Sequence, residues 1–252
     1  MKKIGQTLQM LKRNLAQGQM TPLREILTDA DVEAACHATG HAWRERIFTP
    51  LVTLWGFVGQ SLYPDPSCRA AVARILAALG DSKVSGDTGA YSKARKRLPE
   101  RLIEESSRTI AERLEERLSP EHLWRGRRVR LVDGTGVSMP DTPGLVQAFG
   151  LPPNTKPGVG FPVAHIAGLI SWSTGAVLAA SIDALRCHER HLFRDLWPHL
   201  DPEDIVMGDA GFGSYAEIAL LKAQGIDCVF RVGEARNTDF RRGQRLGDGN
   251  HL

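Results

Sequence analysis

The sequence of 252 residues predicts an α/β protein in two parts, an all-helical domain over residues 1–125 and a mixed sheet with helices against it over residues 126–252. Two observations lead to this division. In the first part, apolar residues recur at helical spacing between signals that start and stop helices. In the second part, the expected order of elements is strand, hairpin, helix, strand, helix, strand, which indicates a sheet covered by helices.

The expected helices of the first part are placed mainly by their ends. Thr21 followed by Pro22 is typical of a helix start, and Gly80 and Pro99 are typical of helix stops. The polar, glycine-rich residues 82–89 are expected to form a loop. The predicted helices cover residues 21–28, 32–39, 43–62, 67–79, 91–98 and 102–118.

The second part begins with a strand that leads into Asp133, because charged and apolar residues alternate over residues 128–132. A proline-rich loop is expected over residues 139–157. Residues 161–171 and 175–184 are expected to pair as a hairpin. Further strands are predicted at residues 204–207 and 227–232, and helices at residues 188–200 and 214–224.

Composition limits the class of protein. The chain is 42% hydrophobic and 24% charged, and it is long enough to bury a substantial core. No apolar run reaches the roughly 18 residues needed to cross a bilayer, and the N-terminus lacks the apolar segment of a signal peptide. We therefore expect a cytoplasmic protein with no membrane partner. The four cysteines form no pattern of zinc ligands, so we expect free thiols.

Positive charge is concentrated in one stretch, although the net charge is only +3. Residues 91–130 contain twelve Lys and Arg against seven Glu and no Asp. Lys93, Arg95, Lys96 and Arg97 are candidate contacts to a DNA backbone, because cations that neutralise phosphates release condensed counterions. Taken alone, the stretch is better explained as a solvated helix face whose arginines pair with nearby glutamates.

Two aspartates occupy matching places in the predicted sheet. Asp133 and Asp209 are each expected at the C-terminal end of an apolar strand, with small residues following. Either one alone is more simply explained as the cap of a turn. Together they favour a site for Mg²⁺ or Mn²⁺, which prefer carboxylate oxygens and keep positions open for water and phosphate. Paired ions of this kind catalyse in-line phosphoryl displacement.

Several other enzyme classes lack their required residues. Leu131 occupies the place of the nucleophilic aspartate of a dehalogenase-type phosphatase. The sequence contains no phosphate-binding P-loop and no nucleophile elbow. The pair Gly158 and Gly160 is followed by Val163 where a dinucleotide-binding motif needs its third glycine. A glycosidase with two carboxylates is disfavoured, because the chain has few aromatic residues to hold a sugar.

The residues around the two aspartates are similar to the catalytic blocks of the insertion element four family of bacterial transposases. The first block is resembled by residues 131–135, 140–143 and 149–150, and the second by residues 208–215. In the first part of the chain, residues 60–63 and 89–99 resemble the helical domain that precedes the catalytic core in one branch of that family.

This resemblance implies a transposase of the DDE type with a ribonuclease H-like core. Asp133 and Asp209 would be two of its three catalytic, metal-binding carboxylates, with Mg²⁺ or Mn²⁺ as cofactor. The implied activity is cut-and-paste transposition, in which DNA strands are cleaved and then joined to a target. The implied partners are double-stranded DNA, namely the terminal repeats and the target, and a second copy of the chain on the paired ends.

The sequence departs from the family in its third carboxylate. The family carries this glutamate in the pattern Tyr, two residues, Arg, three residues, Glu, but Tyr215 is followed at the third place by Ile218. Glu189 and Glu217 are expected on helices in the core and are not assigned to the vacant role. We therefore expect an incomplete core, cut off before that glutamate, and little or no activity of the chain by itself.

Two other functions stay open at this point. The chain could be a non-catalytic DNA-binding fragment that binds transposon ends or inhibits the full-length enzyme. It could also be a metal-dependent hydrolase unrelated to transposition. Binding through phosphates alone should weaken steeply with salt and ignore Mg²⁺, whereas catalysis should require the metal.

Overall fold

The computed structural model describes residues 21–44, 46–79, 86–153, 156, 160–233, 245–247 and 250–251. These residues belong to two compact units that divide between Arg117 and Leu118. The boundary drawn from the sequence, between residues 125 and 126, lies just beyond the 3-10 helix η1 (Pro120–His122). Ser173 Oγ donates a hydrogen bond of 2.5 Å to the carbonyl of His122, which attaches this turn to the second unit.

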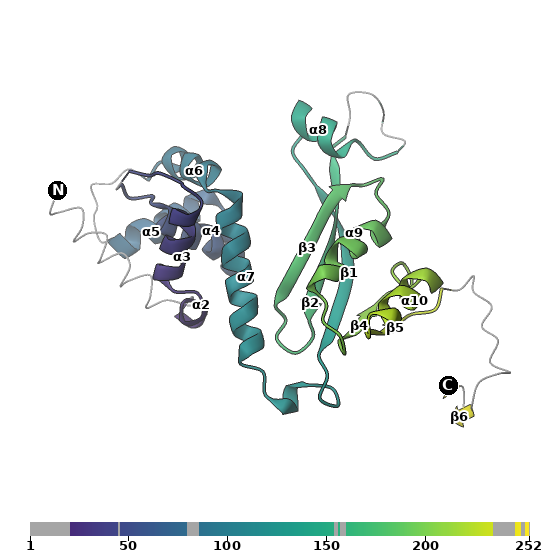
Figure 1. Cartoon of the computed structure of the whole chain (residues 1–252). Coiled ribbons are helices and arrows are strands. Elements are labelled where there is room, and N and C mark those ends of the chain that lie inside the picture. Colours follow the sequence, from purple (N-terminus) through teal and green to yellow (C-terminus); the bar gives the residue numbers. More distant parts are fainter. Residues whose placement is uncertain are drawn as a thin grey trace. The chain divides into compact units, whose positions relative to one another are not determined.

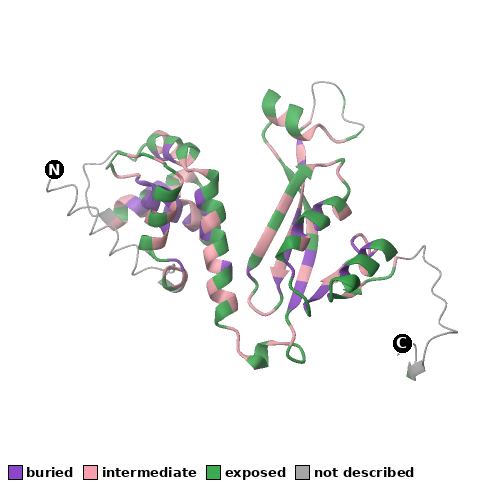
Figure 2. Cartoon of the chain, viewed as in Figure 1, coloured by how far each residue is buried: buried purple, intermediate pink, exposed green. Residues whose placement is uncertain are grey.

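The first unit is all-helical, as predicted (Figure 1). Helix α4 lies at its centre and is buried along most of its length, with the side chain of Trp55 fully buried. Tyr91 is fully buried in a second apolar cluster, to which Val52 of α4 also belongs. Figure 2 shows the buried residues of this unit gathered between its helices. The helices are α2 (Thr21–Ile26), α3 (Asp29–Ala38), α4 (Pro50–Leu62), α5 (Cys68–Leu79), α6 (Thr88–Arg97) and α7 (Glu100–Glu116).

Threonine followed by proline sets where helices begin in both units. Helix α4 begins at Pro50, with the hydroxyl of Thr49 accepting a hydrogen bond of 3.3 Å from the amide of Val52. The prediction of a helix from residue 43 is therefore wrong over residues 43–44 and 46–49, and residue 45 lies outside the described residues. Helix α8 (Pro143–Phe149) begins in the same way at Thr142, within the stretch that we predicted to be a loop.

An ion pair joins helices α3 and α7. The guanidinium of Arg113 donates hydrogen bonds of 2.6 and 2.8 Å to the two carboxylate oxygens of Asp31, and one of 2.5 Å to the carbonyl of Ile26. Asp31 also closes the capping box of α3 with Thr28. The Arg113 guanidinium holds the pKa of the Asp31 carboxyl well below its usual range.

The second unit contains a five-stranded mixed sheet in the order β3-β2-β1-β4-β5. Strand β1 pairs antiparallel with β2 and parallel with β4, so the direction of pairing changes across β1. This order with these directions is that of a ribonuclease H-like core and confirms the predicted fold class. The strands are β1 (Val129–Ser138), β2 (Val163–Ser171), β3 (Val177–Ala184), β4 (Ile205–Gly208) and β5 (Asp227–Phe230), with a separate two-stranded pair, β6 (Arg245–Gly247) and β7 (Asn250–His251).

Helices α9 (Glu189–Leu196) and α10 (Tyr215–Ala223) contribute to the core against one face of this sheet. Val132, Leu169 and Val206 come from three neighbouring strands and lie on the same face of the sheet. They pack in that core with Phe193 and Leu221. Apolar side chains on the opposite face include Ile182, 52% exposed, and Val229, 53% exposed. The helix predicted at residues 188–200 ends earlier and continues as the 3-10 helix η2 (Trp197–His199).

The remaining expectations concern cysteines and membranes. All four cysteines are free; Cys36 is buried and the other three are half-buried. Burial raises the pKa of Cys228 to about 11. None of the helices that the structure describes is long and apolar enough to span a membrane.

Replacing Asp31 by Asn should lower the free energy of unfolding by about 1–2 kcal/mol at pH 7, because charge-assisted hydrogen bonds to Arg113 are lost. A depressed folded-state pKa stabilises the protein above the unfolded-state value of about 4, and this contribution is lost as the pH falls below it. The difference between wild type and variant should therefore shrink towards pH 3, as measured by urea unfolding with tryptophan fluorescence. Glu112→Gln, in an exposed pair with Arg108, should cost less than about 0.5 kcal/mol at either pH.

Candidate active site

Asp133 lies within strand β1 and does not end it. The strand continues to Ser138, in register with Val163 of β2, so the predicted end of the strand at Asp133 is wrong. The antiparallel partner β2 provides backbone hydrogen bonds for these added residues. The parallel partner β4 ends at Gly208, opposite Val132. From Asp133 onward, β1 therefore pairs with β2 alone.

Asp209 directly follows β4, as the sequence predicted. Val132 of β1 and Gly208 of β4 are partners in the parallel register. Asp133 and Asp209 each follow one of these partners along the chain. Neighbouring strands lie about 4.8 Å apart. The structure therefore brings the two predicted residues to the same edge of the sheet, where both are exposed.

Each aspartate is oriented by a backbone amide just after it. The amide of Gly134 donates a hydrogen bond of 2.9 Å to Asp133 Oδ1, and the amide of Gly211 donates one of 2.8 Å to Asp209 Oδ1. Oδ2 of each carboxylate accepts no hydrogen bond from a residue that the structure describes. One oxygen on each side chain is thus fixed, and the other is available to a ligand.

The segment after Asp209 is held by close packing. Phe212 is 1% exposed, and its ring meets the ring of Phe193 edge-on at a centroid distance of 5.7 Å. A β-carbon added at Gly208 would lie 2.7 Å from Val132 Cγ1, and one added at Gly213 would lie 2.5 Å from Phe230 Cβ. Glycine is required at both places because these neighbouring side chains occupy the space that a β-carbon would need.

Glu189, the first residue of α9, lies beside both aspartate segments. A β-carbon added at Gly134 would lie 3.1 Å from Glu189 Oε1, and one added at Gly211 would lie 2.5 Å from Glu189 Oε2. His165 Nε2 lies 3.2 Å from Glu189 Oε1. From the sequence, Glu189 is expected on a helix in the core, so its position beside the two aspartates was not predicted. The glycines after each aspartate were the available signal, because glycine marks a close approach.

Glu217, in contrast, serves the core. Its side chain is 1% exposed, and Oε1 accepts hydrogen bonds from Arg194 of 3.1 Å from Nε and 2.5 Å from Nη2. A buried carboxylate requires such a partner, because its desolvation would otherwise be costly. The pairing ties α9 to α10 on the covered face of the sheet.

The donor chemistry of the site fits a hard divalent cation. Asp133 and Asp209 offer carboxylate oxygens, the ligands that Mg²⁺ and Mn²⁺ prefer. Over the parts of the chain that the structure describes, no group of three or more His, Cys, Asp or Glu side chains is placed to hold a metal ion. The two aspartates offer two carboxylates of the kind such a cation prefers, and the carboxyl group of Glu189 lies beside the glycines that follow them.

The four predicted DNA contacts lie on α6 in the first unit and divide into two kinds. Lys93, Lys96 and Arg97 are exposed. Arg95 is half-buried: its guanidinium lies 4.6 Å from the centre of the Phe57 ring and donates a hydrogen bond of 3.1 Å to Gln60 Oε1. Arg95 therefore contributes to packing within the helical unit.

Comparison with protein families adds the decisive observation. Residues 124–251, about half of the chain, match the family described as the transposase DDE domain. The chain belongs to the DDE transposase family. Comparisons with curated proteins and with solved structures find no match. In this transposase the matched residues contain the whole five-stranded sheet, both aspartates and Glu189.

Gly213→Ala should lower the free energy of unfolding of the second unit by about 1–3 kcal/mol, because its methyl group would overlap Phe230. Phe230 or the loop that carries Asp209 must then move. Urea unfolding monitored by tryptophan fluorescence measures this change.

Gly144→Ala is the matched control in the same unit, since a β-carbon there meets nothing within 4 Å. Gly144 lies in helix α8, where alanine should stabilise the protein by up to about 1 kcal/mol. Equal stabilities of the two variants would contradict the packing assigned to residue 213.

Proposed function

We propose that this DDE transposase is a cut-and-paste enzyme of the insertion element four family, which cleaves and joins the DNA ends of a bacterial insertion sequence. The observation that carries the proposal is the register of β1 and β4, which sets Asp133 beside Asp209 within the matched transposase domain. Its substrates are double-stranded DNA, the terminal repeats and the target, in the bacterial cytoplasm. Two copies act on paired ends.

Asp133 and Asp209 would hold the catalytic Mg²⁺ or Mn²⁺, since each carboxylate keeps one oxygen that accepts no hydrogen bond from the described residues. Bound metal would activate a water or a 3′-hydroxyl and stabilise the leaving oxygen of an in-line displacement. The amides of Gly134 and Gly211 fix each carboxylate before substrate arrives, and this preorganisation lowers the cost of reaching the reactive geometry. Glu189 and its partner His165 pack behind the two segments and hold them in place.

The third catalytic carboxylate is proposed to come from residues that this chain does not supply. The family's tyrosine, arginine and glutamate pattern does not occur in the 252 residues. Glu217 is committed to Arg194, and Glu189 does not complete a group of three ligands with the aspartates. The chain by itself should bind DNA and metal but cleave DNA little or not at all.

A second function is supported by the exposed cations of α6. Lys93, Lys96 and Arg97 could let the helical unit bind transposon ends without catalysis, or let it inhibit a complete transposase by occupying those ends. The two functions share the DNA partner and differ in their need for metal.

Metal binding separates the proposed active site from a binding-only function. Isothermal titration with Mn²⁺ should detect a site that Asp133→Asn and Asp209→Asn each weaken by at least about 10-fold, because each change removes a charged ligand. Glu121→Gln, an exposed carboxylate of the same unit outside the sheet, is the control and should leave binding unchanged.

Mn²⁺ binding that survives in both aspartate variants would sink the proposed metal site. Cleavage of transposon-end DNA provides the second readout. Turnover by this chain with Mg²⁺, abolished by Asp133→Ala, would support the metal site but contradict the proposal that a carboxylate is missing.

A further inference from the structure

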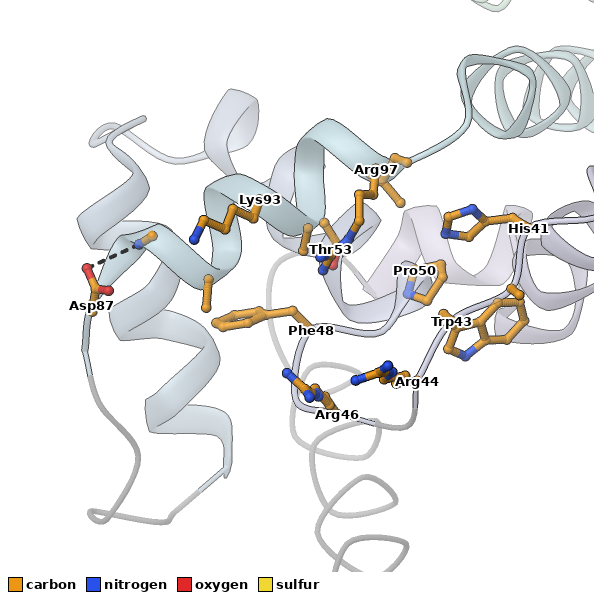
Figure 3. Close-up of a pocket in the computed structure, with 15 residues that line it drawn as sticks. His41, Trp43, Arg44, Arg46, Phe48, Pro50, Thr53, Asp87, Lys93 and Arg97 are labelled. Carbon is orange, nitrogen blue, oxygen red and sulfur yellow. Dashed lines mark hydrogen bonds between the residues drawn. The ribbon is translucent and has the colours of Figure 1, made fainter.

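The helical unit contains a cavity of about 600 Å³ between the segment that precedes α4 and the helix α6 (Figure 3). Four cations line it: Arg44 and Arg46 from the segment, and Lys93 and Arg97 from α6. The figure shows the two arginines of the segment on one side of the opening and the two α6 cations on the other. Residues almost fifty positions apart in sequence thus form one basic rim.

The floor of the cavity is apolar. Phe48, which is half-buried, and Pro50 and Ala94, which are buried, contribute to its lining. The ring of Phe48 rests on the buried ring of Tyr91, with centroids 5.6 Å apart, so the floor is anchored in the core of the unit. The cavity therefore offers a ligand two environments, an apolar surface within and positive charge around the opening.

The positive charge at the rim has little compensation from the residues that the structure describes. None of the four cations forms an ion pair with a carboxylate of the described residues. Asp87 also lines the cavity, and its carboxylate accepts a hydrogen bond of 3.1 Å from the amide of Gly89 at the start of α6. Among the described residues that line the cavity, four exposed cations stand against one carboxylate, and this balance favours an anionic ligand.

We propose that this cavity binds an unpaired nucleotide of a DNA strand, with phosphates between the two pairs of cations and the base against the apolar floor. The proposal rests on DNA being the partner of the proposed transposase. Sites for single-stranded nucleic acid combine a positively charged groove with aromatic side chains in this way. The volume also lies in the range of about 300–1,000 Å³ that small-molecule sites occupy.

An intact duplex would use only part of the cavity. Its bases stay stacked inside the helix, so only phosphates would reach the cationic rim and the apolar floor would stay uncovered. Lys96 is exposed on the same helix but lines a different cavity with Phe57 and Ile103. Of the basic stretch on α6, only Lys93 and Arg97 line the cavity, and they do so together with Arg44 and Arg46.

Fluorescence anisotropy with EDTA present tests the proposal, using a blunt duplex and the same duplex with an unpaired extension at one end. The wild-type chain should bind the extended DNA about 10-fold more tightly. Arg44→Ala with Arg46→Ala should abolish this preference. The same double variant should lower the slope of log affinity against log salt by about 1.4, since two phosphate contacts are lost.

Arg69→Ala with Arg101→Ala is the matched control, because it also removes two exposed cations of the helical unit but leaves the cavity unchanged. This variant should keep the preference for the extended DNA. Circular dichroism verifies that both double variants keep their helices. Equal binding of the two DNAs by the wild type, or a preference that survives in the Arg44 and Arg46 variant, would overturn the proposal.

The outcomes also distinguish this site from the proposed active site. Equal binding of both DNAs, together with Mn²⁺ binding that depends on Asp133, overturns the nucleotide site alone. A preference for the extension that needs Arg44 and Arg46, without Mn²⁺ binding at Asp133, overturns the active site alone.

Discussion

Strand β1 has two neighbours that run in opposite directions and end at different places. The parallel neighbour β4 ends opposite Val132, whereas the antiparallel neighbour β2 continues to the partner of Ser138. The candidate site depends on this difference. Beyond Val132 the side of β1 that faces β4 has no strand partner. Asp133 and the segment that follows β4 lie at this point. A shift of the register by one residue would turn Asp133 to the other face of the sheet.

Close packing also fixes the position of the loop that carries Asp209. Phe193 contacts both Phe212 and Phe230, so one aromatic ring of α9 links the loop to strand β5. The same helix begins with Glu189, against the two glycines that follow the aspartates. Helix α9 therefore contacts the aspartate segments at two places, through the ring of Phe193 near its middle and the carboxyl group of Glu189 at its start.

The sequence predicted the class of fold and the elements that carry the aspartates, because alternation and helix-stop signals are local. It did not predict how far β1 extends, since that depends on the distant partner Val163. It missed helix α8, although Thr142 and Pro143 form the same start signal that was accepted at residues 21–22. The place of Glu189 could not be derived locally, because it depends on how α9 crosses the sheet.

Arg95 illustrates how a run of like charges can divide its tasks. The other three cations of α6 are exposed, but the guanidinium of Arg95 lies over the ring of Phe57 and shares Gln60 Oε1 with the hydroxyl of Tyr91. A scan that neutralised the whole run would therefore combine two defects, a loosened helical unit and a weaker surface charge. Substitutions in this stretch would change the surface charge without loosening the helical unit only if Arg95 were kept.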